Sequence, residues 1–557
     1  MTRRPGCEST DPRRILIIGG VAGGASCAAR LRRLSETAQI QVFDRGPHVS
    51  FANCGLPYYV GDVIQHEEDL LVATPDLFAN RFAIDIHCRT EVASIDREAH
   101  SIRVRNLDNG EEREESYDAL VIATGASPIR PNLPGIDHDG VFAIRTIPDS
   151  QRLRSWIEEK NARHAVVVGG GFIGLEMTEN LVRRGVSVTL IERLAHLMPA
   201  LDAEMATPLH CRLREEGVDL RLQESVSAFE EAGDRLVVHT DQGHRVPADL
   251  VVLGIGVRPE TTLAASCGLE VGALGGLRVD AQMRTNDPAI WAVGDVVENH
   301  HIVTDRPCLM PLAGPANRQG RVAADSIYGR PARFRGVQGT SVCGLFGMTV
   351  ATTGANESLL RSCEIPYEKL YLHPGHHVGY YPGSRPIDLK VLYAPDDGRL
   401  LGAQAVGWEG VDKRIDVIAT ALQAGLSVYD MEEAELCYAP QFGAAKDPVN
   451  IAGMIGANAL RGDAPLAYWG DDEGLLLDVR DPDEFATGHV PGAINIPLHR
   501  LRERLSELSR DQPIRVYCLV GQRAYYATRL LRLNGFDARN MTGGYKTYLQ
   551  LQEQCED

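Results

Sequence analysis

Two cysteines lie in sequence settings that favour sulfur chemistry, and the first is Cys54. It sits in the stretch Ser50-Phe51-Ala52-Asn53-Cys54-Gly55-Leu56-Pro57, and positions 55 to 59 hold no second cysteine. A redox pair within this stretch is therefore excluded. If Cys54 is redox-active, its partner must be a small-molecule thiol or an oxygen. The alternative is an inert buried thiol.

The second cysteine is Cys518, which directly follows the apolar run 514–517 and precedes Leu519-Val520-Gly521-Gln522-Arg523. We expect a strand that ends at Cys518 and a helix that begins just after it. Backbone N–H groups at a helix N-terminus stabilise an anion, so they lower a thiol pKa and favour a persulfide. A buried structural cysteine is the alternative.

The chain before Cys54 predicts a dinucleotide site. An apolar strand at 15–18 enters the turn Gly19-Gly20-Val21-Ala22-Gly23-Gly24, a helix follows, and a strand at 40–43 ends on Asp44. Glycines such as Gly19, Gly23 and Gly24 let a pyrophosphate approach the helix N-terminus, and Asp44 accepts hydrogen bonds from a ribose. Val21 departs from the usual fingerprint, so an ordinary tight turn is the alternative.

A second copy follows the strand predicted at 165–168. Its three fingerprint glycines are Gly169, Gly171 and Gly174, the helix runs to Arg184, and the strand at 188–191 ends on Glu192. Glu192 would bind a 2′-hydroxyl and repel a 2′-phosphate, which favours NADH. The neighbouring Arg193 could tolerate the phosphate and leaves NADPH open.

Two dinucleotide folds suggest a tightly held flavin and an exchanging nicotinamide. The flavin is supported by two further strands, at 120–123 and 290–293. The first ends in Thr124 and Gly125. The second ends in Gly294 and Asp295, where the carboxylate can hold a ribityl chain.

These features resemble the pyridine nucleotide–disulfide oxidoreductases from about Arg14 to Gly456. The resemblance implies an α/β fold with two Rossmann-like domains and an α+β dimerisation domain, in a homodimer. The expected bounds are 13–125 with 255–331 for FAD, 126–254 for NAD and 332–456 for dimerisation. Further cofactor contacts are implied from Gly256, Pro311 and Ala313.

Three stretches, 311–321, 379–383 and 438–448, together with the lone Cys54, look like the coenzyme A-disulfide reductase branch. The resemblance makes Cys54 the nucleophile and electron relay, with Tyr380 and Tyr438 acting from the other subunit. Spacing does not separate Tyr380 from Tyr381, and packing is the alternative role. Coenzyme A would be bound by Arg30, Arg33, Ser50 and Asn53. From the residues alone, Arg30 and Arg33 read better as a solvated helix face.

After a linker expected at 457–474, residues 475–557 resemble a rhodanese domain, with Cys518 and Arg523 in its active loop. The combined interpretation is a flavoenzyme that uses NAD(P)H to reduce coenzyme A disulfide, coenzyme A persulfide or polysulfide, while Cys518 carries sulfane sulfur. Three alternatives stay open: an NADH peroxidase or oxidase that cycles Cys54 through sulfenic acid, a sulfurtransferase with a redox-gating flavin half, and a non-catalytic redox sensor.

Composition sets the remaining limits. The formal charge of −18 argues against a nucleic-acid or anionic-membrane partner. We expect no signal peptide or membrane span, a disordered tail at 1–12 and a cytoplasmic location. The 12 cysteines follow no metal or disulfide spacing. We therefore expect Cys27, Cys211 and Cys267 to be inert packing thiols, and we expect no metal at His373, His376 and His377.

Overall fold

The computed structural model describes residues 13–233, 235–471 and 473–553, so the tail expected at 1–12 lies outside the described residues. The chain divides into two compact units, and each is described by itself. The first holds residues up to Ile191 together with Ser225–Val337, and the second holds Glu192–Glu224 and Gln338 onward. The segment Glu192–Glu224 therefore belongs to the second unit, whereas the rest of the NAD domain expected at 126–254 belongs to the first.

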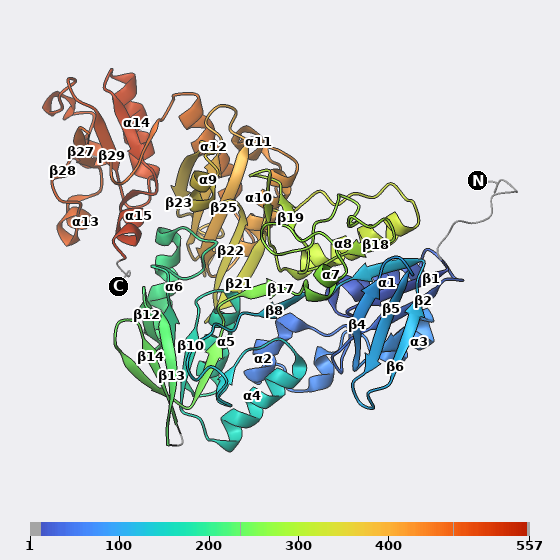
Figure 1. The fold of residues 1–557 in the computed structure, drawn as a ribbon. Helices are drawn as coiled ribbons and strands as arrows, with labels where there is room; N and C mark the ends of the chain where they lie inside the picture. The colour runs from blue at the N-terminus through green and yellow to red at the C-terminus, as the bar shows by residue number, and fades with distance from the viewer. Residues whose placement is uncertain (1–12, 234, 472, 554–557) are drawn as a thin grey trace, which may run out of the picture. The chain divides into compact units, whose positions relative to one another are not determined.

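The first unit contains the sheet that carries the first glycine turn (Figure 1). Two of its parallel strands, Arg14–Ile18 and Ala119–Ile122, are largely buried apolar runs, as expected for strands covered on both faces. In order the strands of the sheet are β18 (Ile290–Ala292), β7 (Ala119–Ile122), β1 (Arg14–Ile18), β2 (Gln39–Phe43) and β3 (Asp85–His87). Helices α1 (Ala22–Arg32) and α8 (Ala313–Ile327) pack together, with Gly320 against the backbone of Gly23.

A second parallel sheet of this unit carries the second glycine turn. Its strands pair in the order β11 (Ser187–Glu192), β10 (His164–Val168), β16 (Leu250–Leu253) and β9 (Val141–Phe142). The associated helices are α4 (Ile147–Glu159) and α5 (Phe172–Arg183), and Gly185 follows α5 with a φ of +75°.

Smaller elements complete the first unit. The antiparallel sheets are β4 (Thr90–Asp96), β5 (Ser101–Asn106) and β6 (Glu112–Ser116), then β13 (Val226–Ala232), β14 (Arg235–Thr240) and β15 (Arg245–Ala248). Two-stranded pairs join β8 (Ala126–Pro128) to β17 (Val257–Pro259) and β19 (Asn299–His301) to β20 (Arg306–Cys308). Short helices are α2 (Leu56–Val60), α3 (Pro75–Phe82) and α7 (Thr262–Ser266).

The second unit is built on an antiparallel sheet with helices packed against it. The strand order is β21 (Ser341–Leu345), β22 (Met348–Gly354), β25 (Leu400–Gly407), β24 (Ile387–Tyr393) and β23 (Glu368–Leu372). The helices are α6 (Ala203–Glu215), α9 (Glu357–Ser362), α10 (Val411–Gln423), α11 (Val428–Glu433) and α12 (Pro448–Leu460), and β12 (Asp219–Leu222) follows α6. Between 332 and 456 the chain thus forms both strands and helices, as the expected α+β domain requires.

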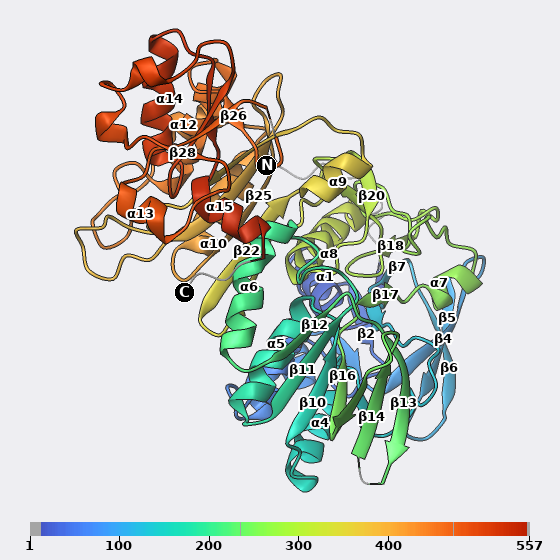
Figure 2. The same ribbon diagram turned by 90° about the vertical axis from the view of Figure 1, so that its left-hand side faces the viewer.

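The same unit ends in a parallel sheet, coloured orange to red in Figure 2. Its order is β26 (Leu466–Ala467), β30 (Ala538–Met541), β29 (Ile514–Tyr517), β27 (Leu475–Asp478) and β28 (Ile494–Asn495), with helices α13 (Pro482–Thr487), α14 (Gln522–Leu533) and α15 (Gly544–Leu551). Within the expected linker 457–474, α12 continues to Leu460 and β26 pairs with β30. The final α/β fold therefore begins earlier than residue 475.

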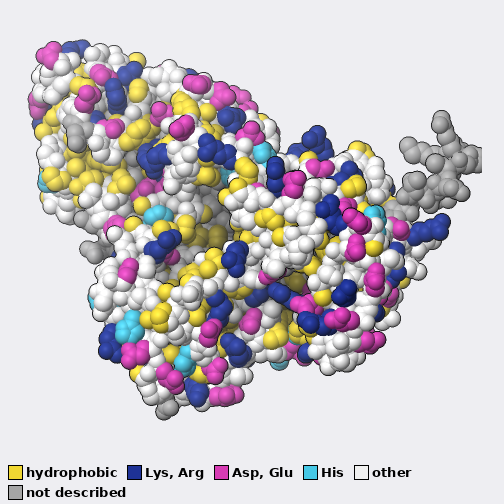
Figure 3. All heavy atoms as spheres, viewed as in Figure 1, with side chains coloured by type: hydrophobic (Ala, Val, Ile, Leu, Met, Phe, Trp, Pro, Cys, Tyr) yellow, Lys and Arg dark blue, Asp and Glu magenta, His cyan; other side chains and the backbone are white. Residues whose placement is uncertain are grey.

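Two features relate to the expectation that the protein has no nucleic-acid or membrane partner: the distribution of surface charge and the apolar length of the helices. On the face shown in Figure 3, acidic and basic side chains are interspersed. Among the described residues, no helix is both long and apolar enough to cross a membrane.

Candidate active site

The Cys54 thiol lies in a short 3-10 segment (Asn53–Gly55) directly before α2. Its side chain is exposed. Desolvation by the surrounding protein nevertheless raises the Cys54 pKa, and the carboxylates of Glu176 and Asp295 raise it further. These neighbours therefore disfavour the thiolate, and a positively charged group nearby would favour it.

Glu176 and Tyr58 belong to this site and were not predicted from the sequence. The Tyr58 hydroxyl donates a hydrogen bond to Glu176 Oε1 at 3.2 Å, which joins α2 to α5. Burial raises the Glu176 pKa to about 6. The two residues are 118 positions apart, so no local sequence pattern could predict that they pair. The only signal was the place of Glu176 two residues after the fingerprint glycine Gly174.

The first glycine turn has the geometry that a dinucleotide requires. Gly19 has a φ of +97°, and a Cβ there would lie 2.2 Å from Ala123 O, while a Cβ on Gly24 would lie 1.9 Å from Gly19 O. Among described residues, no side chain caps the N-terminus of α1. Asp44 accepts hydrogen bonds from the N–H groups of Gly20 at 2.8 Å and Gly46 at 2.7 Å. The turn fits the ADP half of FAD.

The other predicted flavin residues gather at the ends of neighbouring strands. Strands β7 and β18 pair in parallel, so Thr124 and Gly125 after β7 and Gly294 and Asp295 after β18 lie at one edge. Burial raises the Asp295 pKa, and Arg145 opposes this. Gly294 donates its N–H to Gln319 Oε1 at 2.7 Å, and the Thr124 hydroxyl donates to Glu260 O at 2.8 Å. Pro311 and Ala313 lie at the start of α8, the helix that carries Gln319.

The second glycine turn repeats the first. Gly169 has a φ of +102°, and a Cβ there would lie 2.5 Å from Gly254 O. A Cβ on Gly174 would lie 1.9 Å from Gly169 O, and Gly171 is the N-cap of α5. Glu192 is the last residue of β11. Gly256 precedes β17 with a φ of +99°.

The four predicted coenzyme A contacts have different surroundings. Arg30 forms an ion pair with Asp325 at 2.7 Å, so its charge is already balanced, whereas Arg33 at the end of α1 is exposed. Ser50 has a φ of 46°. Beside Cys54, the Asn53 Oδ1 atom is buried and has no hydrogen-bond partner within the described ranges. Their ligand role stays a prediction.

In the second unit, the hydroxyls of Tyr380 and Tyr438 lie 2.8 Å apart, and both side chains are exposed. This hydrogen bond raises the Tyr438 pKa. Tyr381 instead lies edge-on to His377, with ring centroids 5.4 Å apart. Of the two candidates, Tyr380 is therefore the one that pairs with Tyr438.

Cys518 follows β29, as its sequence setting predicts, and its side chain is buried. The Ala524 N–H, in the first turn of α14, points to Cys518 Sγ at 3.4 Å. Gly521 caps this helix with a φ of +90°. Arg523 is held by Glu484 through two hydrogen bonds of 2.6 and 2.7 Å.

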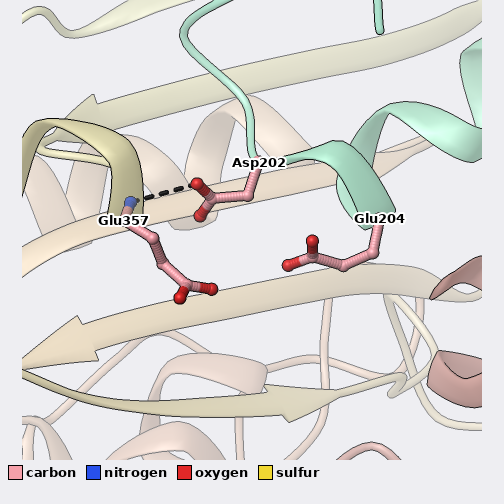
Figure 4. A group of neighbouring side chains, drawn as sticks. All are labelled: Asp202, Glu204 and Glu357. Carbon is pink, nitrogen blue, oxygen red and sulfur yellow. Dashed lines mark hydrogen bonds between the residues drawn. The ribbon is translucent and has the colours of Figure 1, made fainter. Parts of the chain in front are cut away.

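Three buried carboxylates from two segments meet in the second unit: Asp202 and Glu204 at the start of α6, and Glu357 at the start of α9 (Figure 4). The Lys390 Nζ atom lies 2.6 Å from Asp202 Oδ2 and 2.5 Å from one oxygen of each glutamate. Three oxygens around one position resemble a cation site. Here the lysine ammonium fills that role.

The structure shows the surroundings of the histidines for which we expected no metal and of the cysteines that we expected to be inert. His373 bonds to Asp388 at 2.6 Å, and His376 lies 3.4 Å from Glu409. Cys27 is in the core, and burial raises its pKa. Cys211, however, is disulfide-bonded, so the expectation of an inert packing thiol is wrong there. Spacing along a chain carries no disulfide connectivity, which explains the error.

Comparisons with known proteins agree with this architecture. The family model of the pyridine nucleotide-disulphide oxidoreductases matches residues 13–320, and the dimerisation-domain model of the same family matches 340–447. A rhodanese-like domain model matches 466–551. The expected α/β domains are thereby confirmed, and the rhodanese match begins at β26.

Individual relatives extend the likeness over nearly the whole chain. The coenzyme A disulfide reductase of Staphylococcus haemolyticus is 34% identical over 442 residues, 79% of this chain and 98% of the relative. The crystal structure of reduced Bacillus anthracis CoADR-RHD is similar with a TM-score of 0.95 and 44% identity, over 97% of this chain and 98% of the other. An NAD-dependent persulfide reductase from A. fulgidus gives a TM-score of 0.90 and 36% identity, over 96% and 100%. The chain therefore belongs to the pyridine nucleotide-disulphide oxidoreductase family and carries a C-terminal rhodanese-like domain.

Proposed function

We propose that this chain is an FAD-dependent NAD(P)H oxidoreductase that reduces the sulfur–sulfur bonds of coenzyme A disulfide, coenzyme A persulfide or polysulfide. The observation that carries the proposal is the likeness, over nearly all of both chains, to CoADR-RHD and to an NAD-dependent persulfide reductase. The lone Cys54 supports it, since a single thiol needs a small-molecule thiol to form a disulfide. The cofactors are FAD, NADH or NADPH, and coenzyme A.

The chemistry at Cys54 follows from a single thiol. Bound FAD supplies a two-electron relay from the nicotinamide to sulfur. Two electrons break the disulfide between Cys54 and coenzyme A, which leaves the Cys54 thiolate and the coenzyme A thiol. The thiolate then attacks the inner sulfur of coenzyme A persulfide, which expels hydrosulfide and restores the mixed disulfide. Tyr380 and Tyr438 would donate a proton to a departing thiolate.

Cys518 would supply the sulfur. A Cys518 persulfide would pass its outer sulfur to the coenzyme A thiolate, which regenerates the Cys518 thiolate and yields coenzyme A persulfide. Arg523, Arg30, Arg33, Ser50 and Asn53 remain proposed contacts, the last four for coenzyme A. The dimerisation domain supports a homodimer, and we place the enzyme in the cytoplasm without a nucleic-acid or membrane partner.

The test is the intact mass of the denatured, unreduced protein as purified. We expect an increment equal to coenzyme A that dithiothreitol removes and that Cys54→Ser lacks. Cys437→Ser is the matched control, because Cys54 and Cys437 are the exposed cysteines among those described. The control should keep the adduct.

A different mass of Cys54 or a different activity would contradict the proposal. A single added oxygen on Cys54, together with rapid NADH oxidation by peroxide and none by polysulfide, would indicate a peroxidase. Transfer of sulfur from thiosulfate to cyanide without any NADH-dependent reduction would indicate a sulfurtransferase. Negligible turnover with every acceptor would indicate a redox sensor.

A further inference from the structure

Helix α15 contacts the loop that holds Cys518, and its side chains also bond to residues of the dimerisation domain. Figure 2 shows α15 beside α6, the other helix of the second unit that it packs against. We propose that the dimerisation domain positions the Cys518 loop through α15, with Asp388 as the central positioning residue. The inference rests on the proposed role of Cys518 as a sulfur carrier. All residues involved lie in the second unit.

On the loop side, the first turn of α15 binds the backbone next to the thiol. The Tyr545 N–H donates to Cys518 O at 2.8 Å, and the Lys546 N–H donates to Leu519 O at 2.9 Å. A Cβ on Gly544 would lie 2.4 Å from Cys518 O, so helix and loop are in close backbone contact. A shift of α15 therefore moves the carbonyl of the sulfur-carrying residue itself.

On the other side, the same helix turn enters a buried polar network. Asp388 on β24 accepts from Lys546 Nζ at 3.0 Å and from Gln550 Nε2 at 2.8 Å. His373 joins them, with Nδ1 2.6 Å from Asp388 Oδ1 and Nε2 2.9 Å from Thr547 Oγ1. These groups are at most 9% exposed. A buried network of charged hydrogen bonds allows few alternative arrangements, so it fixes the helix.

The edge of the dimerisation sheet adds a second attachment. Strand β23 is the last strand of its sheet, and its Tyr371 N–H donates to Thr542 Oγ1 at 2.8 Å, just before α15. The Tyr468 hydroxyl donates to Lys369 O at 3.1 Å, two residues away on the same strand. Side chains of the rhodanese domain thus satisfy edge groups of β23 that lack a strand partner on that side.

The experiment uses the full-length enzyme with the substitution Asp388→Asn, which keeps the shape and removes the charge that Lys546 and His373 face. Two rates are measured on one preparation: sulfur transfer from thiosulfate to cyanide, and NADH-dependent reduction of coenzyme A disulfide. We expect the kcat of sulfur transfer to fall about tenfold, as for a small misplacement of a reacting group, with reduction within about twofold. Amide hydrogen exchange of 518–524 should become faster.

Matched variants separate positioning from general damage. Gln552→Ala, at the exposed end of α15, should change neither rate. Thr542→Val, a milder change, should lower sulfur transfer in the same direction if Asp388→Asn does not fold. Unchanged sulfur transfer and loop exchange in both variants would overturn the inference, as would parallel losses of both activities. If Cys518→Ser keeps sulfur transfer, the carrier role fails instead.

Discussion

At the scale of single residues, the reactivity of Cys54 depends on the charge of Glu176. Above about pH 6 this carboxyl is ionised and raises the Cys54 pKa. We expect Glu176→Gln to speed iodoacetamide alkylation of reduced Cys54 at pH 7.5 by about 2- to 5-fold, the size of one carboxylate acting through partly solvated surroundings. The rate is read from the mass of the Cys54 peptide.

The same variant should lose a step in the pH profile. In the native chain, Glu176 becomes neutral below about pH 6, so the ratio of the two alkylation rates should fall to about one near pH 5. Glu159→Gln, on the exposed end of α4, should follow the native profile. Parallel profiles for the native chain and Glu176→Gln would show that the carboxylate does not act on Cys54.

At the scale of elements, Lys390 on β24 holds together the start of α6 and the start of α9 through Asp202, Glu204 and Glu357. Removing the ammonium leaves Asp202 and Glu204 without the cation that they share, and leaves Glu357 with Lys369 and the exposed Arg361. We expect Lys390→Met to lower the free energy of unfolding by about 3–5 kcal/mol. Urea denaturation followed by circular dichroism measures the loss.

Lys369→Met is the matched control, because Lys369 also pairs with Glu357, at 2.9 Å, but remains 24% exposed. Its pair lies closer to solvent, so the loss should be about 1 kcal/mol or less. Equal losses for the two lysines would show that burial of Lys390 does not set its contribution.

The elements also show what a sequence can and cannot reveal here. The glycine turns at Gly19 and Gly169 were predictable because each serves a close backbone approach within one strand–turn–helix unit. The Arg30–Asp325 pair joins residues 295 positions apart, and Lys390 meets Asp202 across 188. Such contacts arise when elements that are distant in the sequence pack together. The periodicity of apolar residues in helices and strands therefore cannot predict them. That Tyr380, rather than Tyr381, bonds to Tyr438 likewise became visible only in the fold.

At the scale of the whole molecule, two effects of acidification oppose each other. The formal charge of −18 falls in magnitude as the pH approaches the pI of about 5.5, which reduces repulsion. Burial raises the pKa of Asp388, but His373 and Lys546 outweigh burial and lower that pKa to about 2. In the same way, Lys390 and Lys369 outweigh the burial of Glu357 and lower its pKa to about 2. Carboxyls with lowered pKa values stabilise the fold above their unfolded pKa, and this stability is lost as they are protonated.

We therefore expect the thermal midpoint to be nearly constant between pH 7 and 5 and to fall steeply between about pH 4.5 and 2, the interval between unfolded and folded pKa values. Circular dichroism melts across this range measure it. Asp388→Asn should lower the midpoint at pH 7 and flatten the acid slope, because one of the linked protonations is gone. A midpoint that rises steadily down to pH 3 would mean that charge repulsion, rather than the buried carboxylates, governs the acid response.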